Sequence, residues 1–406
     1  MKNISEIISD GRKWSQFLEY KLADKYLSPA EEKDIRAYVE NREYESCVKD
    51  FEDGNRFAYP TVGIINKQFS NKKRTVYRYA RAENYFLKFL SFCLLEYDNI
   101  FSDNLCSFRK NITVKTVIRR LAGQKGIDDK YSYKVDISDY FNSVDIERLL
   151  PVLEEVLKGD RKLFAFMRSI LENPYVIKGE EVIKQKKGIM AGVPISSFLA
   201  NLYLKDIDRW FLEKGITYMR YSDDIIIFAD TKQEIDKYSQ TLKELLAGHN
   251  LEINSSKEVY TAPGEAWEFL GFSYCASRID ISSAATDKLK KKMKRKARAL
   301  FRWKIKNNAS DERAVRAFIT SFNRKLYDNP RNSETTWTRW YFPVINTDKS
   351  LRVLDGYMQD CIRYIAAGNY SKSRYNFRYK DMKELGYISL VNRYYKFLDN
   401  GFADDE

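Results

Sequence analysis

Histidine and cysteine are scarce in this sequence, which excludes several kinds of chemistry. The 406 residues include one histidine, His249, and five scattered cysteines, Cys47, Cys93, Cys106, Cys275 and Cys361. No two cysteines have the spacing of zinc ligands, and a single histidine cannot help to build such a site. We therefore predict reduced structural thiols, no histidine general base, and a place for His249 at a helix end or in a loop.

Long apolar runs are also missing. No stretch approaches the roughly 18–20 apolar residues that a membrane span requires, and Met1–Arg12 lacks the apolar segment of a secretory signal. Internal repeats and low-complexity tracts are absent too. These absences predict a soluble, cytoplasmic protein that has no membrane partner.

Basic and aromatic side chains, by contrast, are abundant. The chain has 70 basic and 57 acidic residues, a formal net charge of +13, and an aromatic content of 15%. This charge favours a polyanionic partner over an acidic small substrate, although charge alone does not separate nucleic acid from an anionic membrane. Aromatic rings suit stacking on unpaired bases as well as core packing. The length predicts two or three packed units.

Two adjacent carboxylates stand directly before a strand that is expected to be buried. Asp223 and Asp224 precede Ile225 to Phe228, a short, β-branched and apolar run that is typical of an interior strand. Tyr221 belongs to the strand before them, so the two acids fall where a hairpin should turn. Aspartate is common in such turns, and an ordinary turn is the simpler interpretation of an isolated pair.

A further acid has a matching setting. Asp136 lies in a predicted strand between Val135 and Ile137, which point to one side while its carboxylate points to the other. If this strand lies beside the hairpin, Asp136 and Asp223 can share a divalent ion. Oxygen ligands of this kind suit magnesium, which also takes water and substrate phosphates. Two such ions stabilise the attacking and leaving oxygens of phosphoryl transfer.

The order of these motifs resembles the palm of a reverse transcriptase. Asp136 then matches the first metal-binding motif, and Tyr221 to Asp224 match the tyrosine-x-aspartate-aspartate box. The resemblance continues through Gly188 to Leu204, Leu251 to Lys257 and Phe269 to Phe272. Each motif alone is weak, but their common order and spacing make a specific signal. The sequence is most similar in character to bacterial reverse transcriptases related to group II introns, retrons and phage-defence systems.

This resemblance implies an α+β fold of the right-hand polymerase type, with an antiparallel palm sheet packed on helices. We expect a helical N-terminal extension over residues 1–57, fingers and palm over 58–285, and a basic helical thumb over 286–406. The resemblance further implies that Asp136 and Asp223 bind two Mg²⁺ ions, for which Mn²⁺ can substitute. Asp224 would adjust the electrostatic field at the metal site or bind metal more weakly. Lys257 would protonate the leaving pyrophosphate or neutralise its charge.

The resemblance also assigns nucleotide binding to a basic fingers segment and to the loop before an apolar helix. Its candidates are Lys73, Arg74, Arg109, Phe141, Gly192 and Pro194. Arg78 is a further candidate, and spacing does not choose among Arg78, Lys73 and Arg74. Phe141 matches the bulky residue that excludes a ribose 2′-hydroxyl, which favours deoxynucleotides. Ala191 stands where many members of the family carry glutamine, so an unusual affinity for dNTPs or an unusual choice of substrate is expected.

Two later segments resemble parts that hold nucleic acid. Phe269, Leu270 and Gly271 match the primer-grip hairpin, in which glycine permits close approach of the backbone to the primer. Beyond Asp287 a predicted helix carries basic residues around an apolar stripe, and the candidates for phosphate-backbone contact are Lys291, Lys294, Arg295 and Arg298. A solvated charge run is the alternative interpretation.

The implied reaction is the addition of dNTPs to a 3′-hydroxyl with an RNA template. No ribonuclease H, integrase or endonuclease segment is recognisable in the sequence, so a dedicated cellular role is expected, namely phage defence with a partner noncoding RNA. The expected partners are this RNA, a DNA primer or product, and dNTPs, with a second copy of the chain or a second protein left open. Two alternatives remain: template-independent or protein-primed DNA synthesis by the same fold, and a non-catalytic RNA-binding scaffold.

Overall fold

The computed structural model describes residues 3–23, 27–66, 73–327, 336–368 and 377–402. The chain divides into two compact units, Met1–Glu265 and Ala266–Glu406. This division falls ahead of the expected boundary at residue 285, because the hairpin that begins at Trp267 bonds to residues further along the chain. The backbone N–H of Ser282 donates to Gly271, and that of Asn346 donates to Ile279.

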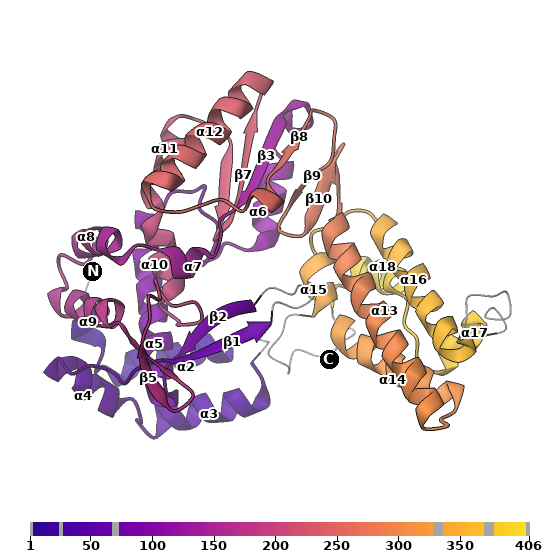
Figure 1. The fold of residues 1–406 in the computed structure, drawn as a ribbon, viewed down its shortest axis with the longest axis horizontal. Coiled ribbons are helices and arrows are strands. Elements are labelled where there is room, and N and C mark those ends of the chain that lie inside the picture. Colours follow the sequence, from indigo (N-terminus) through magenta and orange to yellow (C-terminus); the bar gives the residue numbers. More distant parts are fainter. Residues whose placement is uncertain (1–2, 24–26, 67–72, 328–335, 369–376, 403–406) are drawn as a thin grey trace. The chain divides into compact units, whose positions relative to one another are not determined.

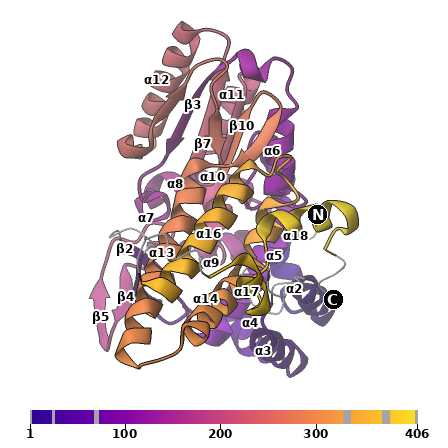
Figure 2. The same cartoon turned by 90° about the vertical axis from the view of Figure 1, so that its right-hand side faces the viewer.

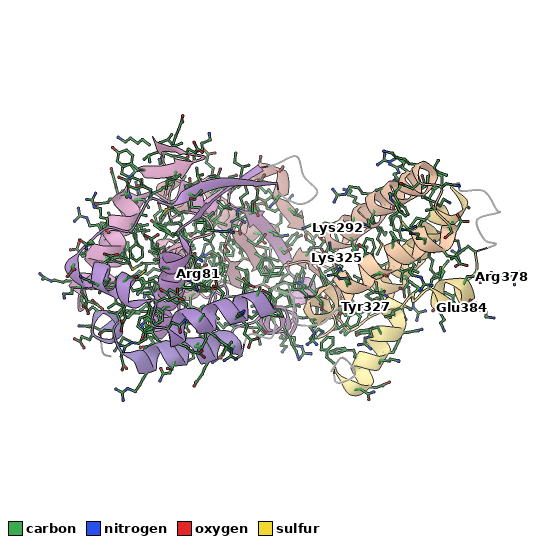
Figure 3. All side chains as sticks on the ribbon, turned by 90° about the horizontal axis from the view of Figure 1, so that it is seen from below. Arg81, Lys292, Lys325, Tyr327, Arg378 and Glu384 are labelled. Atoms are coloured by element: carbon green, nitrogen blue, oxygen red, sulfur yellow. The ribbon has the colours of Figure 1, made fainter. Side chains whose placement is uncertain are left out.

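The first unit begins with four helices, as the apolar spacing of residues 1–57 predicts. They are α1 (Ile4–Ile7), α2 (Gly11–Leu22), α3 (Pro29–Glu40) and α4 (Glu45–Asp53). Ser28 caps α3 through a reciprocal pair of hydrogen bonds with Glu31. Arg81, labelled in Figure 3, pairs with Asp34 of α3 and with Glu43, and so ties these helices to α5 (Arg81–Leu94).

A four-stranded sheet follows, in the order β2-β1-β4-β5. Its strands are β1 (Thr61–Asn66), β2 (Lys73–Arg78), β4 (Tyr175–Lys178) and β5 (Glu181–Lys184). β1 pairs with β2 in the antiparallel sense and with β4 in the parallel sense. The hairpin of β4 and β5 turns at Gly179, which has positive φ.

The second sheet of this unit has the order β6-β7-β3-β8, and each neighbouring pair is antiparallel. Its strands are β3 (Tyr131–Asp136), β6 (Tyr218–Tyr221), β7 (Asp224–Ala229) and β8 (Val259–Thr261). Helix α12 (Lys232–Gly248) packs against β7 and β3 (Figures 1 and 2). Val135, Ile225 and Ile227 are fully buried, so β7 is the interior strand that its apolar run predicts.

Further helices surround the two sheets. They are η1 (Leu95–Ile100), α6 (Val114–Ala122), η2 (Ile127–Asp129), α7 (Tyr140–Ser143), α8 (Ile146–Val156), α9 (Arg161–Glu172), α10 (Ser196–Tyr203), α11 (Lys205–Glu213) and η3 (Ser255–Lys257). The apolar run from Phe198 to Phe211 is typical of a single helix, but it is divided at Leu204, which leaves helical geometry with φ −112° and ψ 14°. His249 is the C-cap of α12, in agreement with the prediction of a helix end.

The sequence from Leu251 to Lys257 alternates as a strand would, but the segment is not a strand in the structure. It makes one isolated bridge, between Ile253 and Ile137, and then turns into η3. The hydroxyl of Ser256 donates to the side chain of Asn254 at 2.7 Å. Local bonding of this kind competes with a β ladder, and it explains why an alternating pattern forms a turn here.

The second unit consists of a three-stranded sheet and six helices over its described residues. The strands β9 (Trp267–Phe269), β10 (Phe272–Cys275) and β11 (Arg278–Ile281) are antiparallel in the order β11-β10-β9. The helices are α13 (Ser283–Lys306), α14 (Asp311–Leu326), α15 (Trp337–Tyr341), α16 (Lys349–Ala367), α17 (Tyr379–Glu384) and α18 (Leu390–Asn400). Helices α13, α14 and α16 pack side by side (Figure 2).

Two buried charged groups join the helices of this unit. The carboxylate of Asp355 on α16 accepts hydrogen bonds at the start of α18, from the backbone of Leu390 at 2.8 Å and of Val391 at 3.0 Å. The ammonium of Lys304 on α13 donates to the carbonyls of Ile365 and Ala366 at the end of α16, each at 2.8 Å. Both contacts satisfy backbone groups that helix ends leave unpaired.

Among the described residues, no helix is both long enough and apolar enough to cross a membrane.

Candidate active site

Three carboxylates that are distant in the sequence meet at one end of the second sheet. In the antiparallel register of β3 and β7, Asp136 lies directly opposite Asp224. The backbone N–H of Ile137 donates to the carbonyl of Asp223 at 3.0 Å, which continues this pairing by one residue. The structure therefore brings together all three acids that the sequence singles out.

The hairpin that carries Asp223 and Asp224 has a short turn, and a residue from another segment of the chain holds it. Tyr221 pairs with Asp224, so Ser222 and Asp223 form a two-residue hairpin loop. Ser222 has φ +59°, in the left-handed region. Its backbone N–H donates to the hydroxyl of Ser107 at 2.8 Å. Strained residues of this kind persist where the surrounding structure holds them, and they are frequent at functional sites.

Burial and like charge raise the pKa of both acids in the hairpin. The pKa of Asp223 is raised by burial first and by the charge of Asp136 second. Burial raises the pKa of Asp224 to about 6, and the charges of Asp223 and Asp136 add to this effect. Carboxylates that repel one another in this way fit a site for a divalent cation, whose charge relieves the repulsion.

The three acids do not make a metal site on their own. Across the described residues, no group of three or more His, Cys, Asp or Glu side chains could hold a metal ion. Magnesium commonly takes one or two protein carboxylates and fills its octahedron with water and substrate phosphates. The oxygen-only chemistry of Asp136, Asp223 and Asp224 fits such an ion.

Lys257 faces the same acids. Its Nζ lies 2.6 Å from Oδ2 of Asp136, and its side chain is 50% exposed. Its charge also lowers the pKa of Asp223 and that of Asp224, although burial outweighs this effect at both. An exposed ammonium beside the carboxylates can donate a proton or neutralise charge on a phosphate.

Arg74 and Phe141 border the site from two other elements. The guanidinium carbon of Arg74 on β2 lies 6.0 Å from the ring centroid of Phe141 on α7. The positive charge of Arg74 also lowers the pKa of Asp223. Contact and charge thus favour Arg74 as the basic fingers residue that spacing did not single out. The side chain of Lys73 lies outside the described part of the chain.

The glycine loop before α10 is held between α7 and β2. Gly188 has φ +51°, and a Cβ placed there would lie 2.4 Å from the carbonyl oxygen of Phe141. Gly192 has φ +100°, and its Cβ would lie 3.0 Å from the carbonyl oxygen of Tyr77. The backbone N–H of Tyr77 donates to Ala191 at 2.8 Å. Glycine at both positions is therefore required by positive φ and by close backbone packing.

Ser196 and Ser197 are of a residue type that often caps helices, but neither caps α10. Its N-cap is Ile195, and Ser196 lies inside the helix. The hydroxyl of Ser196 instead lies close to the carbonyls of Ile189 and Met190. Pro194 is half-buried just before the helix.

Arg109, a predicted phosphate ligand, has a different role in the structure. Its Nε and Nη2 bind the carboxylate of Asp98 at 2.8 and 2.9 Å, and its Nη1 donates to Ser102 at 2.7 Å. The side chain is only 6% exposed. A guanidinium whose donors are bound inside the protein is structural, so Arg109 is not included in the proposed nucleotide site.

A buried ion pair behind the hairpin was missed by the sequence prediction. Arg220 and Asp208 are both fully buried, and Arg220 Nε lies 2.8 Å from Asp208 Oδ1. A signal was present: Asp208 occupies the apolar face of a helix beside Ile207 and Phe211, where an unpaired acid would be costly.

In the second unit, the predicted primer-grip hairpin has a tight turn. Leu270 and Gly271 have φ +52° and +86°, and Phe269 is fully buried. A Cβ at Gly271 would lie 3.0 Å from the hydroxyl oxygen of Tyr341. Positive φ and the close packing of Tyr341 both account for this glycine.

The predicted basic face is present on α13. Leu289, Met293 and Ala297 are buried along one side of this helix. The basic candidates are all exposed: Lys291, Lys294, Arg295 and Arg298. Their arrangement is compatible with contact to a phosphate backbone.

Taken together, an antiparallel sheet that presents carboxylates from two neighbouring strands, beside an arginine and a glycine loop, is consistent with an α+β fold of the right-hand polymerase type. The sequence profile of the family described as reverse transcriptase (RNA-dependent DNA polymerase) matches residues 65–274. The chain belongs to this family.

The chain is similar to the following proteins at low sequence identity. The retron Ec86 reverse transcriptase of Escherichia coli is 20% identical over 224 residues, which cover 52% of this chain and 66% of that enzyme. The apo telomerase structure from Candida tropicalis is similar with a TM-score of 0.47 and 13% identity, over 88% of this chain and 65% of that one. Telomerase from the same organism with a fragment of telomeric RNA has a TM-score of 0.46 and 12% identity, over 86% and 67%.

Proposed function

We propose that the chain is an RNA-directed DNA polymerase that adds dNTPs to a 3′-hydroxyl by two-metal catalysis. The observation that carries this proposal is the meeting of Asp136 with Asp224 and Asp223 across neighbouring strands. Membership of the reverse transcriptase family supports RNA as the template and DNA as the product. No covalent nucleophile is needed, because positioning and electrostatics carry phosphoryl transfer.

The metal ligands in this proposal are the three acids. Asp136 and Asp223 would hold two Mg²⁺ ions, or Mn²⁺ in their place, and Asp224 would contribute more weakly. When bound, such ions activate the 3′-hydroxyl and stabilise the charge that develops on the leaving pyrophosphate.

Other side chains bind and orient the nucleotide. Arg74 pairs with the triphosphate, because its planar fork can bind two oxygens at once. Lys257 gives a proton to the leaving pyrophosphate or neutralises it. The ring of Phe141 packs against the sugar and excludes a 2′-hydroxyl, and the loop around Gly192 and Pro194 forms the floor of the nucleotide site.

The nucleic acid partners follow from the same reaction. Phe269, Leu270 and Gly271 would support the primer end. The exposed basic side chains of α13 would hold the phosphate backbone of the nucleic acid. We further propose that the template is a partner noncoding RNA and that the enzyme acts in anti-phage defence in the cytoplasm. This role is supported by the resemblance to bacterial reverse transcriptases related to retrons and phage-defence systems.

Primer extension tests the activity. Wild-type protein with a DNA primer on an RNA template, Mg²⁺ and dNTPs is expected to make a template-length product, and Asp223→Ala and Asp224→Ala are expected to abolish it. Asp236→Ala, an exposed acid on α12, serves as the matched control and should leave extension unchanged. Unchanged extension by Asp223→Ala would remove the assignment.

Two further measurements separate the alternatives and identify the RNA. Products that form without a template, or that migrate freely only after protease digestion, would indicate untemplated or protein-primed synthesis. Sequencing of nucleic acid that copurifies with the protein should recover one enriched RNA and its complementary DNA. Recovery of neither would contradict the role of a partner RNA.

A further inference from the structure

A cavity in the first unit has no part in the proposed chemistry. It has a volume of about 290 Å³ and lies between α2, α5 and the segment Phe101–Asn111. Helices α2 and α5 pack on one another, and both are at the lower left of Figure 1. Its size is at the lower end of the range for small-ligand pockets.

The lining of this cavity carries positive charge. Four basic residues line it against one acid, Asp98. The charge of Asp98 is matched by Arg109, which binds it through two nitrogens. Three ammonium groups also line the cavity, those of Lys21, Lys88 and Lys110. Lys21 Nζ lies over the ring of Tyr20, 5.6 Å from its centroid, and Lys88 Nζ lies over that of Tyr85 at 4.9 Å. A cavity of this charge favours a phosphate-bearing ligand.

Aromatic rings line the same cavity and are open to solvent. Tyr20 is 48% exposed and Phe108 is 45% exposed, although large rings are usually buried. The ring of Tyr20 lies 5.0 Å from that of Phe92, tilted by 37°. Exposed rings beside ammonium groups are the combination that binds unpaired bases, by stacking on the base and neutralising its phosphate.

The cavity is connected to the candidate active site through Phe108. This residue has φ +53°, a strained value for a bulky side chain. Its ring centroid lies 6.5 Å from that of Tyr221, which directly precedes Ser222 and Asp223 in the carboxylate hairpin. A ligand that contacts Phe108 in the cavity is thus separated from Tyr221, the residue before the hairpin loop, only by the ring of Phe108.

We propose that this cavity binds one unpaired nucleotide of an RNA strand. Its base lies against Tyr20 and Phe108, and its phosphate lies among Lys21, Lys88 and Lys110. A free nucleotide offers the same base and phosphate, but the contact of Phe108 with Tyr221 favours a strand that continues to the active site. The identification of this strand as the RNA to be copied rests on the proposed function.

Binding of single-stranded RNA to the full chain tests the proposal. A fluorescein-labelled RNA of about 12 nucleotides is titrated by fluorescence anisotropy at several salt concentrations. Tyr20→Ala should weaken binding about tenfold without changing the salt dependence, because it removes a stacking partner. Tyr20→Phe keeps the ring and should bind as the wild type does.

The second pair of variants tests the phosphate contact. Lys110→Ala should weaken binding and lower the slope of log K against log salt by about 0.7, as expected for one lost phosphate contact on a single strand. Lys110→Arg should restore the slope. Lys162→Ala, an exposed lysine on α9 outside the cavity, should bind with the wild-type slope.

Wild-type affinity and slope in both Tyr20→Ala and Lys110→Ala would overturn the proposal. The proposal would also be overturned if adenosine 5′-monophosphate bound the wild type and both variants lost this binding but still bound RNA as the wild type does. The site would then take a free nucleotide. Primer extension by the wild type separates the two proposals. If the variants lose RNA binding and the wild type does not extend primers, the proposed polymerase activity is contradicted but the proposed nucleotide site in the cavity is supported.

Discussion

The guanidinium of Arg220 and the carboxylate of Asp208 form an ion pair with no exposed surface on either side chain. The hydroxyl of Tyr218 donates to the same carboxylate at 3.0 Å, and Arg220 Nη1 lies 3.3 Å from the carbonyl oxygen of Ser222. Arg220 directly precedes the carboxylate hairpin. The ion pair therefore supports this hairpin from behind, and removal of either partner should affect both stability and activity.

Asp208→Ala is expected to lower the free energy of unfolding by about 3–5 kcal/mol, because it leaves a buried guanidinium without its counter-charge. The double variant Asp208→Met with Arg220→Met should recover most of this loss in urea unfolding, yet extend primers poorly because the hairpin loses its support. Glu172→Ala breaks the exposed pair with Arg168 on α9 and should change stability by less than about 1 kcal/mol. An Asp208→Ala protein of wild-type stability would contradict this interpretation.

Gly188→Ala should be far more harmful than Gly179→Ala, although both glycines have similar positive φ. The added methyl group at Gly188 would lie 2.4 Å from the carbonyl oxygen of Phe141, whereas no described atom lies within 4 Å at Gly179. Gly179→Ala is therefore expected to cost about 1–2 kcal/mol for its backbone conformation alone. Urea unfolding and primer extension measure the difference, and equal effects of the two substitutions would refute it.

Phe141→Ala should relax the discrimination between deoxynucleotides and ribonucleotides. If the ring of Phe141 packs against the sugar, its removal should raise the relative incorporation of ribonucleotides by about tenfold or more. Phe141→Tyr keeps the bulk and should retain the wild-type preference. The measurement is the ratio of kcat/KM for a dNTP and the matching rNTP, and an unchanged ratio in Phe141→Ala would show that the ring has no such role.

Lys187 predicts a specific dependence of stability on pH. Burial lowers its pKa from 10.5 to about 8, so the unfolded chain binds more protons than the folded one between these values. Stability should therefore rise with pH across this window, and the full destabilisation is present below about pH 8. Lys187→Met should raise the free energy of unfolding by up to about 3 kcal/mol near neutral pH.

The gain from Lys187→Met should shrink as pH rises through the window and vanish above it. Urea unfolding at about pH 7 and about pH 10 measures this change. Lys186→Met is the matched control, because Lys186 is the exposed neighbour and should show neither effect. A gain that is independent of pH would contradict the linkage to this ammonium.

Local patterns predicted much of the fold and the centre of the site. The alternation of Val135, Asp136 and Ile137 and the apolar run after Asp224 identify two strands, because side chains on a strand alternate between faces. The motif order then implied that the strands are neighbours, and the structure pairs them. The cap of α3 was equally readable, because Ser28 and Glu31 satisfy each other locally.

Contacts between distant residues could not be read in the same way. The partner of Arg109 is Asp98, which lies in η1, and nothing in its local sequence distinguishes a structural arginine from a phosphate ligand. The bond between Ser222 and Ser107 likewise joins segments that only the folded chain brings together. Sequence spacing indicated which residue types the site requires, whereas burial and pairing decided which of them can face a nucleotide.

The central claim is that Asp136 and Asp223 act as one site, and single-turnover primer extension by their variants tests it most directly. We expect Asp136→Asn and Asp223→Asn each to slow extension by about a thousandfold or more. The double variant should be no slower than either single one, because residues that act as a unit are not additive. Wild-type rates in either single variant, or a double variant whose loss equals the product of the two, would contradict a shared site.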